Sequence, residues 1–225
     1  SLLQIENEFY GTIRPKRTVQ RGERPLHALR ERGVEYVEVR LMDLNPFETL
    51  GISAATARFL DVFLLHCLLT DSPPDTPEEI AELSRNQHRT AATGRDPALL
   101  LERAGAQVKL TDWGHEVLAG CEPIAHAMDQ AMGGTAYTEA WRAARAALSA
   151  PEQLPSARVL QAVQAAQGQS FKNFVAEQSH STRDAFLMQP YPDALRDRYD
   201  HMAVASMEEQ RRIERSDTMP FEEYR

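Results

Sequence analysis

The sequence predicts an α+β chain whose strands fall within its first fifty residues and whose helices fill the remainder. The segment Val34–Phe47 alternates apolar and polar residues with period two, which is the pattern of a strand. From Ser53 onward, apolar residues recur at three- and four-residue spacing, which is the helical period. With 225 residues, of which 42% are hydrophobic, the chain has room for one large domain or two small ones.

The side chains of this strand segment are expected to face opposite sides of a sheet. Val37, Val39 and Leu41 form the set that suits a core. Glu38 and Arg40 share the other face, at a separation of about 6.5–7 Å. There the carboxylate could hold a metal ion and the guanidinium could hold a phosphate. A solvated ion pair gives the same pattern, so spacing alone leaves both interpretations open.

The residues before this segment are expected to supply a second strand and a basic loop. Leu2–Tyr10 is predicted to be a strand or a short amphipathic helix, and Arg14–Pro25 a basic loop. Pro25–Arg32 is predicted to be a short helix that ends at Gly33. Two strands alone do not make a stable sheet, so another chain or a missing part of this one should complete it. A chain that opens in mid-strand without methionine is expected to be a fragment or a processed product.

The rest of the chain is predicted to hold six or so helices, most of them bounded by a capping residue, a proline or a glycine. The first is expected to be buried on most sides, Thr111 is expected to cap the third, and Pro123 to kink or split it. The segments Leu99–Arg103 and Gln107–Leu110 fit either class. The predicted helices are Ser53–Thr70, Thr76 to about Thr90, Asp112 to about Met132, Thr135 or Thr138 to about Ser149, Pro155 or Ser156 to Gln167, Ser170–Met188 and about Asp193–Ser216.

Composition narrows the classes of partner. A net charge of −8 argues against a general nucleic-acid or anionic-membrane surface but leaves small anionic ligands possible. The longest apolar run, Val62–Leu69, is too short to cross a bilayer and is interrupted by His66. The two cysteines, Cys67 and Cys121, are too few for a disulfide framework. Both are expected to be buried thiols in a reducing, cytoplasmic setting.

Motifs with a known mechanism are missing from the sequence: it has no phosphate-binding or dinucleotide-binding glycine loop, no C-x-x-C pair and no H-E-x-x-H. Asp112 and His115 share a helix face without a third partner and are expected to be a surface pair. Acids and bases near the start remain, and together they suit phosphoryl chemistry, since oxygen ligands hold Mg²⁺ and guanidinium groups neutralise phosphate. These candidates are Glu6, Glu8, Arg14, Lys16, Glu38 and Arg40.

Two early segments carry a family resemblance. LQIENEFYGTIRPKR and GVEYVEVRLMDLNPF resemble the middle of the proteobacterial glutamate–cysteine ligases (γ-glutamylcysteine synthetases), and the spacing between them agrees. ARFLDVFLLHCLL, RNQHRTAATGRDP and DTMPFEEYR resemble that family more weakly. The resemblance covers nearly the whole chain and implies the second, C-terminal half of such an enzyme. It also implies a glutamine synthetase-like antiparallel sheet, to which residues 1–50 contribute strands and on which a helical region, 51–225, packs within one larger catalytic domain.

The resemblance implies a reaction as well. ATP, with Mg²⁺ or Mn²⁺, phosphorylates the γ-carboxylate of L-glutamate, and the amine of L-cysteine then displaces phosphate in the first step of glutathione synthesis. Glu38 matches the metal-ligating glutamate of the E-V-R motif, and Arg40 matches the arginine that contacts the transferring phosphate. Asn7 and Arg14 match positions on the nucleotide side. The family's other metal-binding glutamates and its main glutamate- and cysteine-binding residues lie in its first half, so this chain is expected to need that half and to be inactive and poorly folded alone.

Two alternatives stay open at this point. In the first, the chain is a non-catalytic helical interaction module in which Glu38 and Arg40 form a structural ion pair. In the second, it is part of a related ligase that joins a carboxylate to a different amine.

Overall fold

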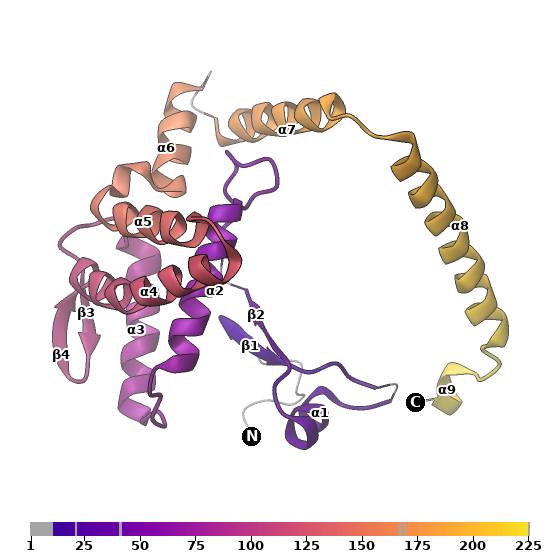
Figure 1. Cartoon of the computed structure of the whole chain (residues 1–225), viewed down its shortest axis with the longest axis horizontal. Helices are drawn as coiled ribbons and strands as arrows, with labels where there is room; N and C mark the ends of the chain where they lie inside the picture. The colour runs from indigo at the N-terminus through magenta and orange to yellow at the C-terminus, as the bar shows by residue number, and fades with distance from the viewer. Residues whose placement is uncertain (1–10, 21, 41, 167, 169, 225) are drawn as a thin grey trace. The chain divides into compact units, whose positions relative to one another are not determined.

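A computed structural model describes residues 11–20, 22–40, 42–166, 168 and 170–224. The chain divides into two compact units, residues 1–169 and residues 170–225. The predicted strand at Leu2–Tyr10 lies outside the described residues. The α+β class is confirmed, and the proposed division at residue 50 stays a prediction. The elements of the first unit (Figure 1) are β1 (Ile13–Lys16), α1 (Pro25–Arg32), β2 (Tyr36–Val39), α2 (Ala54–Leu69), α3 (Pro77–Thr93), β3 (Leu100–Arg103), β4 (Ala106–Lys109), α4 (Leu110–Met132), α5 (Ala136–Ser149), the 3₁₀ turn η2 (Pro151–Gln153) and α6 (Pro155–Ala165).

The strand predicted at Val34–Phe47 is shorter than expected, and β2 ends at Val39. Its antiparallel partner is β1, in a stretch where a basic loop was predicted, so that part of the prediction is wrong. The misleading residue is Pro15. The Arg40 N–H donates to the Thr12 carbonyl, and hydrogen-bonded pairs alternate along an antiparallel ladder, so Pro15 falls at a position that needs no N–H toward β2.

The apolar face of this two-stranded sheet is not buried in the described structure. Ile13 and Val37 are 39% and 43% exposed, although Val37 was expected in a core. A hydrophobic surface of this kind indicates that the sheet lacks its cover among the described residues.

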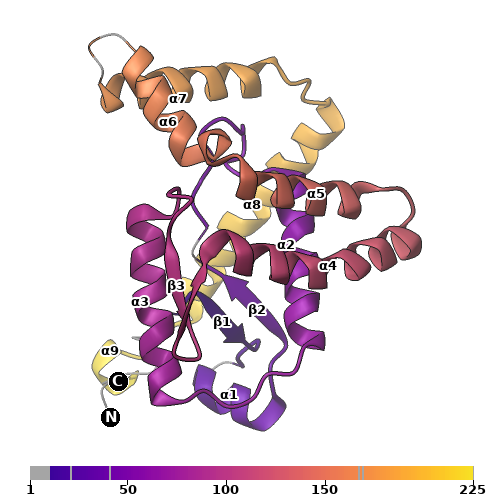
Figure 2. The same cartoon turned by 90° about the vertical axis from the view of Figure 1, so that its left-hand side faces the viewer.

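The core of the first unit lies instead where α2, α4 and α5 cross (Figure 2). Ser53 caps α2 as predicted, by accepting a hydrogen bond from the Thr56 N–H. The prediction that α2 is buried on most sides is wrong, because only one face packs and Leu68 is 76% exposed. Cys67 lies on the open side, so its predicted burial is also wrong. The residues of the core are Val62, Leu118, Cys121, Ala125 and Trp141.

Helix α4 begins at Leu110 rather than after Thr111, because β4 runs directly into it. Pro123 lies inside it and does not split it. The next helix, α5, follows Thr135 but is capped by a residue of α4: the buried carboxylate of Asp129 accepts hydrogen bonds from the N–H groups of Tyr137 and Thr138, both at 2.9 Å. Burial alone raises the pKa of Asp129, but these hydrogen bonds and one from the Thr138 hydroxyl outweigh it and lower that pKa.

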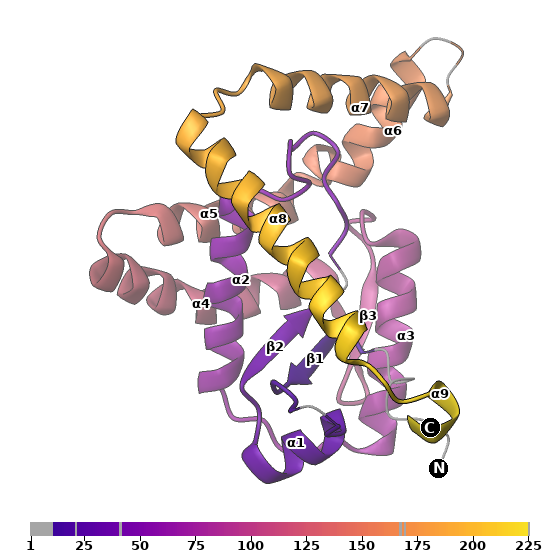
Figure 3. The same ribbon diagram turned by 90° about the vertical axis from the view of Figure 1, so that its right-hand side faces the viewer.

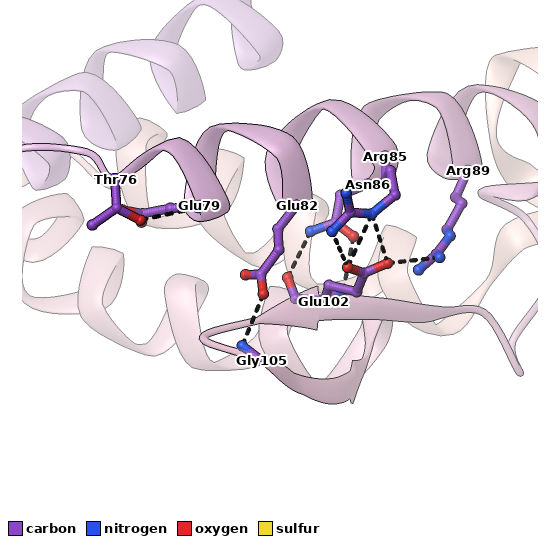
Figure 4. Close-up of polar contacts among 8 residues, drawn as sticks. All are labelled: Thr76, Glu79, Glu82, Arg85, Asn86, Arg89, Glu102 and Gly105. Atoms are coloured by element: carbon purple, nitrogen blue, oxygen red, sulfur yellow. Dashed lines mark hydrogen bonds and ion pairs between the residues drawn. The ribbon is translucent and has the colours of Figure 1, made fainter.

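The ambiguous segments after α3 form a hairpin, β3–β4, that lies alongside α3 (Figure 4). Asn86 of α3 is buried, and its side chain forms two hydrogen bonds with the backbone of Glu102, as a neighbouring strand would. The Asn86 side-chain N–H donates to the Glu102 carbonyl at 2.7 Å, and the Asn86 side-chain oxygen accepts from the Glu102 N–H at 2.8 Å. The Glu102 carboxylate also forms ion pairs with Arg85 and Arg89 of the same helix. These contacts fix the hairpin to α3 and thereby hold the start of α4.

Replacing Asn86 by alanine is expected to lower the free energy of unfolding by about 2–3 kcal/mol, because it leaves a backbone N–H and a carbonyl of Glu102 without partners at a partly buried place. Urea unfolding followed by tryptophan fluorescence measures the loss. The matched control is Gln87→Ala on the same helix, at an exposed residue, which should change the free energy by less than about 0.5 kcal/mol. Equal losses in the two variants would contradict this role.

The second unit consists of α7 (Phe171–Met188), α8 (Asp193–Ser216) and α9 (Phe221–Tyr224). Ser170 caps α7 through the Asn173 N–H, and α8 follows a proline-flanked turn, both close to the predicted bounds. Helix α8 has no buried residue among those described. Across both units, no described helix combines the length and the apolar character needed to cross a bilayer.

Candidate functional site

The β1–β2 pair presents a charged face on which one carboxylate is surrounded by cations (Figure 3 shows the two strands above α1). Glu38 of β2 stands opposite Arg14 of β1. Its Oε2 atom lies 3.2 Å from Nζ of Lys16, and its Oε1 atom lies 3.9 Å from Nε of Arg40. The predicted sharing of one face by Glu38 and Arg40 is therefore confirmed, and their chemical roles stay predictions.

The two oxygens of Glu38 differ in their surroundings. Oε2 is screened from solvent, and the ammonium group of Lys16 lies against it at 3.2 Å. The contact with Lys16 is the main reason that the pKa of Glu38 falls below its usual value, against the opposing effect of burial, with smaller help from the charges of Arg40 and Arg14. Glu38 is thus held as a carboxylate, the form that binds a cation.

A magnesium ion would find part of its coordination here. Within the described part of the chain, no three histidine, cysteine, aspartate or glutamate side chains gather as a metal-binding group. Glu38 offers oxygen, the atom that Mg²⁺ prefers, but one carboxylate is too few, and Mg²⁺ commonly fills its shell with water and substrate phosphates. Glu38 therefore fits as one ligand of a metal that a phosphate ligand and other residues must complete.

The basic loop after β1 folds back on its own acids. Arg32 of α1 donates to both oxygens of Glu23, at 2.7 and 2.8 Å, and to the Thr18 carbonyl. Hydrogen bonds from Arg32 and from the Gln20 N–H lower the pKa of Glu23 to about 2. The Thr18 N–H donates to Glu35 at the start of the β2 segment. These contacts hold the loop at the far end of the charged face, and Arg32 has a structural role in them.

Of the site residues predicted from the sequence, Glu38, Arg40 and Arg14 come together on one face, whereas Asn7 lies outside the described residues, as do Glu6 and Glu8. Lys16 was among the candidates for phosphoryl chemistry, but its ion pair with Glu38 was not predicted, because this residue was placed in a loop. The period-two run from Arg14 through Lys16 was the available signal, and Pro15 concealed it.

Asp112 and His115, predicted to be a surface pair, do not contact each other through any hydrogen bond or ion pair among the described residues. They line a pocket of about 380 Å³ between the turn after α3, the start of α4 and the end of α5, together with Arg95. His66, predicted to be a core histidine, is half-buried beside Gly120, where a Cβ atom would come within 2.5 Å of its ring. That close approach lets α2 cross α4 and gives His66 a packing role.

Comparison with known proteins points to one family of enzymes. The family model for glutamate–cysteine ligase matches residues 1–90, which include the charged face. Glutamate–cysteine ligases from Bordetella parapertussis and Azotobacter vinelandii are 44% and 42% identical to the whole chain, which spans 42% of the length of each.

Solved structures extend the comparison to the fold. Glutamate–cysteine ligase from Francisella tularensis, in complex with AMP, superposes on 99% of this chain with a TM-score of 0.86 and 32% identity, and the chain covers 44% of it. A bifunctional glutathione synthetase from Pasteurella multocida shares the fold, with a TM-score of 0.56 over 80% of this chain, 22% of its own length and 24% identity. The resemblance of this chain to the proteobacterial glutamate–cysteine ligases is therefore confirmed, and the chain spans about two-fifths of the length of the curated proteins that it matches.

Proposed function

We propose that this chain is the C-terminal part of a glutamate–cysteine ligase, in which it binds the phosphates of ATP and contributes one ligand to the catalytic Mg²⁺. The observation that carries the proposal is the face of β1–β2, where Glu38 lies among Arg14, Lys16 and Arg40 within the region that the family model matches. The AMP bound to the Francisella relative supports a nucleotide as the ligand.

The charges of this face suit a phosphoryl group more than a neutral ligand. Among the described residues of this face, the cations Arg14, Lys16 and Arg40 lie around the carboxylate of Glu38, on a chain whose net charge is −8. Arginine can grip two phosphate oxygens at once, and charge that grows on the transferring group is stabilised by cations already in place. The side chain of Arg40 is 40% exposed, and its ion pair with Glu38 is long, at 3.9 Å, so Arg40 has room to turn toward a phosphate.

The proposed reaction has two steps. The γ-phosphoryl group of ATP moves to an oxygen of the glutamate γ-carboxylate, and ADP leaves. The amine of cysteine then attacks the acyl carbon, the C–O bond to phosphate breaks, and phosphate and a proton are released. Mg²⁺, when bound, would supply positive charge that neutralises the phosphates. In this scheme Glu38 holds the metal, Arg40 steadies the transferring group, and Arg14 and Asn7 bind the nucleotide.

The remaining part of the ligase is the proposed partner. Ile13 and Val37 leave an apolar sheet face open, and the relatives are more than twice as long as this chain. The partner would cover that face, add strands to a glutamine synthetase-like sheet, and bring the glutamate and cysteine sites and further metal ligands. We place the assembled enzyme in the cytoplasm, with no nucleic acid or membrane as partner.

The decisive measurement is product formation by the complete enzyme, in which this chain is joined to the rest of its ligase. Glutamate, cysteine, ATP and Mg²⁺ should give γ-glutamylcysteine, ADP and phosphate in equal amounts, and omission of ATP or Mg²⁺ should stop the reaction. Mg-ATP should also raise the melting temperature, because a ligand that binds the native state stabilises it. A melting temperature indifferent to Mg-ATP would favour a non-catalytic module, and turnover only with another amine would favour a different ligase.

A further inference from the structure

Lys16 is the cation that lies nearest to the carboxylate of Glu38. Its Nζ atom is 3.2 Å from Oε2, the oxygen that is screened from solvent, whereas Arg40 reaches the other oxygen at 3.9 Å. An ammonium group therefore lies against the screened oxygen of the carboxylate that would hold a metal.

The charge on this face disfavours a metal that arrives alone. Among the described residues, Lys16 and Arg40 both form ion pairs with the carboxylate of Glu38, so a divalent cation approaching Glu38 meets two positive charges already in place. Phosphate groups are attracted to the same face. Electrostatics therefore couples the two ligands, because an anion that neutralises the face also lowers the cost of bringing a cation to Glu38.

We propose that Lys16 is a positioning residue that exchanges partners during substrate binding: it neutralises Glu38 until the metal arrives with the nucleotide, and its ammonium then moves to a phosphate oxygen. This inference rests on the proposed function. Lysine suits the exchange, since its charge is compact and sits on a flexible stem with three donors. The Lys16 side chain is 33% exposed and so has room to turn outward.

Removal of the Lys16 charge should therefore move two quantities in opposite senses. In Lys16→Met without nucleotide, Mn²⁺ should bind two- to fivefold more tightly, because Lys16 no longer competes for Glu38. This change in affinity corresponds to the small free energy of a partly exposed ion pair. The KM for ATP should rise about tenfold, because a charged contact to phosphate is lost. Mn²⁺ binding is read directly from the paramagnetic resonance signal of the free ion, in the complete enzyme.

Three further variants make the comparison sharp. Lys16→Arg keeps the charge and should restore the KM for ATP to within about threefold of the parent value. Lys109→Met makes the same chemical change on the β3–β4 hairpin and should alter neither quantity. Lys16→Gln, which keeps a polar side chain, repeats the test if the methionine variant does not fold. Far-ultraviolet circular dichroism checks each variant.

The outcomes separate this inference from the proposed function. Unchanged Mn²⁺ binding in folded Lys16→Met or Lys16→Gln, or weaker binding, would overturn the exchange, and so would an unchanged KM for ATP. If the unmodified complete enzyme makes no γ-glutamylcysteine from ATP, the proposed function itself is wrong. A normal parent activity together with tighter Mn²⁺ binding and a raised KM supports both.

Discussion

Replacing Glu38 by glutamine in the complete enzyme is expected to lower kcat by about 10²–10³-fold, the usual cost of removing one preorganised electrostatic group. The amide keeps the shape of the side chain but loses the negative charge that holds a cation. Both ion pairs of Glu38 involve partly exposed side chains, so the loss of stability should be small. Steady-state assays at saturating ATP measure kcat, and a thermal melt checks the fold.

Glu116→Gln is the matched control for this substitution. Glu116 also forms an ion pair with an arginine, Arg103, at 2.7 Å, and that contact also lowers its pKa. It lies on α4, away from the β1–β2 pair in the sequence and in a different element. Its variant should keep kcat within about twofold, since an exposed pair contributes little. Normal turnover in Glu38→Gln, or an equal loss in both variants, would remove the metal role from Glu38.

Replacing Trp141 by alanine is expected to lower the free energy of unfolding by about 3–5 kcal/mol, the cost typical of deleting a buried aromatic side chain. Trp141 is 4% exposed at the centre of the α2–α4–α5 core, and its indole N–H donates to the Leu118 carbonyl at 2.7 Å. The variant loses both the packed volume and this hydrogen bond between α5 and α4. Urea unfolding followed by circular dichroism measures the difference.

Two variants divide that loss into its parts. Trp141→Phe keeps an aromatic ring but removes the N–H. The lost hydrogen bond should account for about 1 kcal/mol of the decrease in its free energy of unfolding. Trp113→Ala removes the other tryptophan, which is only partly buried and lies under the guanidinium of Arg103, and should cost clearly less than Trp141→Ala. A larger loss in Trp113→Ala would show that the core is centred elsewhere.

The helices could be predicted from the sequence because their boundaries are local. Ser53, Thr76 and Ser170 cap their helices through their own side chains, and Gly33 ends α1 with a positive φ of 73°. The pairing of Glu38 with Arg40 was predictable for the same reason, since period two follows from strand geometry alone. The structure confirms each of these from contacts within a few residues.

What could not be predicted depends on residues distant in the sequence. Asp129 caps α5 from the preceding helix, and Asn86 pairs with the backbone of Glu102 across sixteen residues, so no local pattern marks either role. Cys67 belongs to an apolar run but lies on the side of α2 that the described core does not cover. Lys16 was a candidate, but its ion pair with Glu38 was not predicted, because the strand that carries it contains a proline.

That proline makes the two outer margins of the ribbon unequal. The nitrogen of Pro15 points away from β2 and carries no hydrogen. A strand that pairs with the outer edge of β1 would therefore lack one backbone hydrogen bond at Pro15. Val37 and Val39 direct complete amide groups to the outer margin of β2. An added strand can therefore make its full set of backbone hydrogen bonds along the outer edge of β2, the strand that carries Glu38, but not along the outer edge of β1.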